Sequence, residues 1–86
     1  MKKVNTDVLN RFTRNLISIL DNMGISKKKG KDRIKDYVTY LSNNTNISKY
    51  RLKKMLTYDV KKLVTADDIN KLSEALKVSY AIFFKE

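Results

Sequence analysis

Apolar side chains recur every three or four residues along four stretches of the chain, the spacing that places them on one face of an α-helix. These stretches cover about 6–23, 32–44, 48–57 and 65–78, and a shorter apolar run at 80–85 predicts a last helix. No stretch alternates apolar and polar positions as a half-buried strand does. The pattern therefore predicts an all-α domain of roughly five helices.

The apolar members of these stripes are the predicted core. They are Val8, Leu9, Phe12, Leu16, Ile17, Leu20, Met23, Ile34, Tyr37, Val38, Leu41, Leu52, Met55, Leu56, Ile69, Leu72, Ala75, Leu76, Val78, Ile82 and Phe83. Tyr40 is expected in the core or at its rim rather than as a stacking platform for a base. Phe84 is expected to be an exposed anchor, suited to a dimer contact.

Polar residues mark the predicted helix ends. Gly24 supplies a stop, Ser48 and Ser79 are N-caps, and Thr65 begins a carboxylate variant of the capping box with Asp68. The asparagine-rich segment 43–46 interrupts the pattern. Asparagine tolerates the left-handed backbone conformation, so we expect a sharp left-handed corner there.

The composition excludes several chemistries. A chain of 86 residues has the size of one domain, and it contains no Cys and no His. Disulfides, zinc sites with thiolate or imidazole ligands, and catalysis by a Cys nucleophile or His base are therefore excluded or disfavoured. With two glycines there is no phosphate-binding loop, and Asp32 and Asp36 stand among basic neighbours, as on a solvated, ion-paired helix face. We expect no enzyme, cofactor or metal.

The apolar runs are too short for a membrane span, and the lack of cysteine favours a reducing cytoplasm. The net charge of +10 is more informative, because it is concentrated. Residues 24–64 carry 12 basic and 3 acidic side chains, whereas residues 65–86 carry 3 basic and 4 acidic ones. A compositional bias would spread lysines along the chain, so the concentration favours a surface that binds nucleic acid.

Within the basic region, a predicted helix ends, a short turn follows, and Ser48 begins a second helix. Leu52, Met55 and Leu56 form its apolar side. The rest of its circumference carries basic and aromatic side chains: Lys49, Tyr50, Arg51, Lys53 and Lys54. A short helix with this outer surface is suited to the major groove of DNA.

The segment Leu-Ser-Asn-Asn-Thr-Asn-Ile-Ser-Lys-Tyr-Arg-Leu at 41–52 resembles the helix-turn-helix of lambda-repressor-like (Xre-type) DNA-binding domains. That family has Leu-Ala, three variable residues, Gly-Val-Ser, three more, then Ile or Val. Residues 65–79 are similar to the family's fourth helix, which ends in Ala-Leu-Gly-Val-Ser, and 80–84 match its closing hydrophobic turn. The departures are Ser42 and Ser73 for Ala, Asn46 for Gly, a lengthened region at 26–36 and a short extension around 58–64.

The resemblance implies one helix-turn-helix domain over 1–86, with the motif at about 32–57. It implies base contacts from Lys49, Tyr50 and Lys54, with Arg51 and Lys53 shared between bases and backbone. Phosphate contacts would come from Ser48, Lys61 and Lys62. For Lys28 and Lys29, in the 27–31 cluster, a second phosphate grip and a solvated loop remain open. A packing role for Tyr50 also remains open, as does ordinary solvation of Arg51 and Lys53.

The expected function is sequence-specific binding of double-stranded DNA by a small transcriptional regulator, a repressor or Cro-like protein of bacterial, phage or plasmid origin. It would act as a homodimer, without a small-molecule substrate. The alternative is a protein-interaction module on the same fold, such as an antitoxin, an anti-repressor or a phage-encoded inhibitor of a host complex. Binding to RNA or a membrane surface by charge alone is a third hypothesis, disfavoured by the capped helices with core-forming faces.

Overall fold

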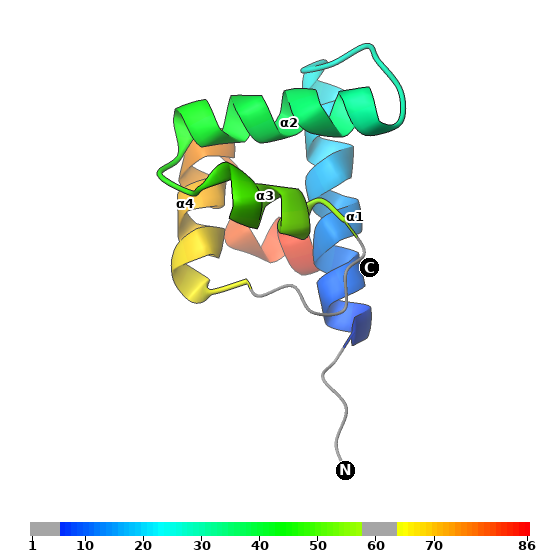
Figure 1. The fold of residues 1–86 in the computed structure, drawn as a ribbon. Helices are drawn as coiled ribbons and strands as arrows, with labels where there is room; N and C mark the ends of the chain where they lie inside the picture. Colours follow the sequence, from blue (N-terminus) through cyan, green and yellow to red (C-terminus); the bar gives the residue numbers. More distant parts are fainter. Residues whose placement is uncertain (1–5, 58–63) are drawn as a thin grey trace.

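The computed structural model describes residues 6–57 and 64–86, whose path is traced in Figure 1. These residues form four α-helices and one 3-10 helix, and they contain no strand. In chain order the elements are α1 (Thr6–Met23), α2 (Lys31–Asn44), α3 (Lys49–Met55), α4 (Ala66–Leu76) and η1 (Tyr80–Phe84). The predicted all-α class is confirmed, and the last predicted helix is a 3-10 helix.

The helices enclose a common core. α2 packs against α3 and α4, while η1 packs against α1 and α4. In the view of Figure 1, α2 lies across the top and α3 lies below it, between α1 and α4. This arrangement gives α3 neighbours on several sides and leaves part of its surface to solvent.

Each element contributes apolar side chains to this core at the predicted helical spacing. The buried ones are Phe12, Leu16, Leu20, Tyr37, Val38, Leu41, Ile47, Leu52, Met55, Leu56, Leu72, Leu76 and Phe83. Truncating one of the fully buried leucines to alanine would cost about 2–5 kcal/mol of stability. Tertiary packing, rather than helix propensity, therefore holds the short α3 in place.

Two core expectations are wrong. Met23 is 43% exposed, because it lies at the end of α1, next to Gly24. Phe84 is no exposed anchor: it is half-buried, with its ring centre 6.1 Å from that of Phe12. η1 curls back onto α1, so both of its phenylalanine rings pack on Phe12.

The predicted caps are confirmed. Ser48 accepts a hydrogen bond from the N–H of Arg51, and Ser79 accepts one from Ala81. Thr65 and Asp68 form a reciprocal capping box at the start of α4. Gly24 follows α1 with a φ of 70°, the left-handed conformation that glycine adopts at a helix end without a Cβ clash.

The corner between α2 and α3 is built differently from the expectation. Asn46 is not left-handed: among the described residues other than glycine, only Lys77 has a positive φ. Thr45 instead turns the chain in an extended conformation, with φ −135° and ψ 173°. The left-handed position lies at the end of α4, where Lys77 has a φ of 58°.

Candidate nucleic-acid interface

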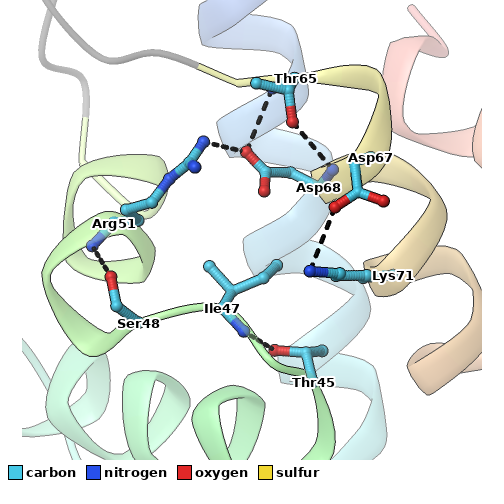
Figure 2. A network of polar contacts seen from close by, with 8 residues as sticks. All are labelled: Thr45, Ile47, Ser48, Arg51, Thr65, Asp67, Asp68 and Lys71. Carbon is cyan, nitrogen blue, oxygen red and sulfur yellow. Dashed lines mark hydrogen bonds and ion pairs between the residues drawn. The ribbon is translucent and has the colours of Figure 1, made fainter.

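The corner between α2 and α3 is held by Thr45 and Ile47. The N–H and the hydroxyl of Thr45 both donate to the carbonyl of Leu41, at 2.8 and 2.7 Å. The same hydroxyl accepts the N–H of Ile47 at 3.2 Å, a contact drawn in Figure 2. The Ile47 side chain is buried in the core. This local network sets the direction in which the chain enters α3.

The surface of α3 is divided into two faces. Leu52 and Met55 are fully buried, whereas Lys49, Tyr50 and Lys53 are exposed. Tyr50 is 71% exposed, so the alternative of a half-buried packing residue is wrong. An exposed aromatic ring on the same helix as exposed lysines can contact a base edge or a sugar without first leaving a buried position.

The ring of Tyr50 also has a cationic neighbour. The Nζ of Lys54 lies 5.4 Å from the ring centre, within the range of a cation–π interaction. Lys54 is partly buried, one helical turn after Tyr50. The contact restricts the ring and places positive charge beside it, so these two predicted site residues form one unit.

Arg51 points towards α4. Its guanidinium forms an ion pair with Asp68, whose side chain is 4% exposed. The Oδ2 of Asp68 in this pair also accepts the N–H of Thr65 at 3.1 Å, so one carboxylate joins α3 to the α4 capping box (Figure 2). A buried carboxylate requires such partners, since an unpaired one would be strongly destabilising. This ion pair connects α3 to α4 and helps to orient α3.

A second anchor comes from α1. The buried hydroxyl of Thr13 donates to the carbonyl of Met55, the last residue of α3, at 2.9 Å. Sequence reasoning missed Thr13, although a polar residue among the apolar positions of a helix stripe was the available signal. It also read Asp68 only as part of a cap and not as the partner of Arg51. Together the two contacts hold α3 at opposite ends.

The remaining predicted contacts lie around α3. Ser48 is exposed at the N-terminus of α3, and its hydroxyl accepts a hydrogen bond from the backbone N–H of Arg51 at 3.3 Å. The Nζ of Lys28 is 3.8 Å from a carboxylate oxygen of Asp36, which ties the 26–30 connection to α2, and Lys29 is exposed. The other two predicted phosphate contacts, Lys61 and Lys62, lie outside the described residues.

The hydroxyl of Tyr37 on α2 donates a hydrogen bond to the carboxylate of Asp21 on α1. Burial and this hydrogen bond raise the pKa of Tyr37 to about 12. Tyr37 is fully buried and Tyr40 partly buried, as expected, so these rings belong to the core and its rim.

In the parts of the chain that the structure describes, no three His, Cys, Asp or Glu side chains are grouped as metal ligands. No helix there is long and apolar enough to cross a membrane. Comparisons with family models, curated proteins and solved structures found no match to this chain.

Proposed function

We propose that this chain is a helix-turn-helix protein of the lambda-repressor-like type that binds duplex DNA with sequence specificity and regulates transcription. The observation that carries the proposal is the two-faced α3. Its inner face is fixed by packing and by the contacts of Arg51 and Thr13, and its outer face carries Lys49, Tyr50 and Lys53 in solvent. A rigid short helix with a free basic and aromatic face can enter a major groove without rearranging.

In this proposal, discrimination between bases comes from the outer face of α3. Lys49, Lys53 and Lys54 donate to acceptors on base edges, and the Tyr50 ring contacts a neighbouring base or sugar. For Arg51 we propose a positioning role in place of the expected base or backbone contact, because its ion pair with Asp68 joins α3 to α4 and would set the angle at which α3 meets the duplex. Ser48 contributes a phosphate contact beside the first turn of α3.

Phosphate contacts would set the register, and the concentration of positive charge in residues 24–64 supports them. Lys28 and Lys29 stand before α2 and can approach the backbone from that side. A homodimer would read two half-sites about one helical turn apart, because two copies of α3 must enter successive major grooves on one side of the duplex.

The test is selection of bound duplexes from a random pool at about 150 mM salt, where weak charge-driven binding is largely screened. We expect enrichment of one motif, repeated or palindromic if the protein is a dimer. Uniform weak binding that disappears as salt is raised would contradict sequence recognition.

Variants of α3 then connect the motif to the helix. Tyr50→Ala and Lys53→Ala should each lower the preference for the selected site about tenfold. Lys85→Ala, which removes the same charge outside α2 and α3, is the matched control and should keep that preference. Lys29→Ala distinguishes a phosphate contact from a solvated loop. If Lys29 contacts a phosphate, the variant lowers the slope of log affinity against log salt concentration by about one and leaves the preference for the selected site unchanged. If the α3 variants behave like Lys85→Ala, α3 is not the reading element.

A further inference from the structure

A groove with a volume of about 880 Å³ lies between α2 and α3 and reaches α1. Its apolar lining comes from Ile17, Ile34, Val38 and Leu56. Ile17 and Ile34 are only partly buried, so the groove exposes apolar surface beside a helix that otherwise packs well. Apolar surface of this kind is a common feature of sites for protein partners.

The groove follows from the unequal lengths of the two helices. α2 has 14 residues and α3 has 7, so α2 is longer by about 10 Å. α3 ends at Met55, where Thr13 holds it against α1. α3 can therefore cover only part of α2. The N-terminal half of α2, which carries Ile34 on its inner side, extends beyond the end of α3.

Positive charge lines both edges of this groove. Lys31 and Lys35 stand one helical turn apart on α2, and Lys49 and Lys53 stand one turn apart on α3. None of these four lysines forms an ion pair with a described residue, and no described Asp or Glu lines the groove. Arg33, also in the lining, pairs with Asp21 at 3.5 Å, while its buried Nε–H has no acceptor among the described residues.

We propose that this groove binds an acidic amphipathic helix of a partner protein. Apolar side chains at successive turns of that helix would cover the lining, as in other helix-in-groove complexes. Asp and Glu on its flanks would pair with the lysines, since carboxylates one turn apart repeat at the same interval of about 6 Å.

Other occupants match these features less well. Phosphates of a duplex could pair with the lysines, but they would leave the apolar lining against water. A small molecule with one carboxylate would fill part of the lining and satisfy one edge, whereas cations line two edges. A helix with an apolar stripe between two acidic flanks matches the lining and both edges.

Occupation of the groove would also affect the surface that contacts DNA. Lys49, Tyr50 and Lys53 line the groove and belong to the outer face of α3. The partner helix and duplex DNA would therefore exclude each other, and the partner would act as an anti-repressor. This consequence depends on the proposed function, but binding of the helix does not.

The experiment measures binding of labelled designed peptides to the full chain by fluorescence anisotropy, at about 150 mM salt and without DNA. The first peptide, of about four helical turns, carries leucines at i, i+3, i+4 and i+7 spacing with glutamates on both flanks. The second has the same composition in scrambled order, and the third has lysines for the glutamates. We expect the first to bind at least about tenfold more tightly than either of the others.

Two protein variants place the site. Thr39 is exposed and lines the groove, so Thr39→Trp fills the groove without touching the core or the charge. We expect it to weaken binding of the first peptide at least about tenfold. Asn70→Trp, on the exposed side of α4, is the matched control and should leave binding unchanged. Circular dichroism of both variants checks that the fold is kept.

Three outcomes would overturn the proposal. Equal binding of the scrambled acidic peptide would show that the site accepts any polyanion, of which the phosphate backbone of a duplex is one. Equal binding by Thr39→Trp would place the peptide elsewhere. Failure of the first peptide to bind, with Thr39→Trp converting a dimer to a monomer, would show that a second copy covers the groove. Competition between the first peptide and a selected duplex tests mutual exclusion separately, so a chain that binds no duplex leaves the peptide result intact.

Discussion

Replacing Thr13 with valine tests whether α1 holds the C-terminus of α3 through a single buried hydroxyl. Thr13 is fully buried, and its hydroxyl donates to the carbonyl of Met55 at 2.9 Å. Valine has nearly the same shape but no donor. The change therefore removes this hydrogen bond, and the longer one of 3.5 Å from the same hydroxyl to the carbonyl of Thr57, while leaving the packing around the side chain almost unaltered.

The expected loss of stability follows from two opposing effects. A buried carbonyl that loses its donor costs about 2 kcal/mol, within the usual range for an unsatisfied group. The methyl group of valine that replaces the hydroxyl is buried, and its burial contributes up to about 0.8 kcal/mol of stability. The net loss is therefore about 1 kcal/mol, equivalent to a fall in melting temperature of about 6 °C for a domain of this size.

The assay is urea unfolding followed by circular dichroism, with thermal melting as a second measurement. Thr39→Val makes the same chemical change at an exposed site on α2 and should shift stability by less than about 0.5 kcal/mol. If Thr13→Val is as stable as Thr39→Val, the hydroxyl of Thr13 does not anchor α3. At a temperature where Thr13→Val is folded, we also expect weaker binding of the selected duplex, because α3 is less firmly held.

Three further predictions concern other particular contacts. Lys77→Gly should raise the free energy of unfolding in urea by about 1 kcal/mol, because Lys77 holds a left-handed φ of 58°; an unchanged or lower value would contradict this. Asp68→Asn should lower that free energy by about 2 kcal/mol, since it weakens the ion pair and the capping box together, and a double-mutant cycle with Arg51→Met should show coupling. Tyr37 holds its proton more tightly in the folded protein, where its pKa is raised to about 12 from 10.0. Its contribution to the free energy of unfolding is therefore complete below pH 10 and is lost as the pH rises towards 12. Tyr37→Phe should remove that part of the pH dependence of urea unfolding, whereas parallel wild-type and variant curves between pH 9 and about 11.5 would contradict it.

The sequence alone predicted the helices and their caps. Apart from Met23, the apolar stripes agree with the structure, as do the Gly24 stop and the caps at Ser48, Thr65 and Ser79. Each of these features is local, since a cap involves residues within three or four positions and a stripe repeats over the same interval. The exposure of Lys49 and Lys53 also followed from the apolar side of α3, whereas a packing role for Tyr50 stayed open until the structure showed its ring to be exposed.

Tertiary structure decided which side chains of the candidate site are exposed and which of them pair with other helices. Arg51 looked equivalent to its basic neighbours, but its partner Asp68 is 17 residues away, and Thr13 reaches α3 across 42 residues. Sequence also misplaced the left-handed residue, because Thr45 can turn the α2–α3 corner through its own hydroxyl while the end of α4 requires a left-handed Lys77. The groove depends in the same way on how α1, α2 and α3 cross. Helix periodicity encodes which face of a helix is buried, but not which partner the fold brings to that face.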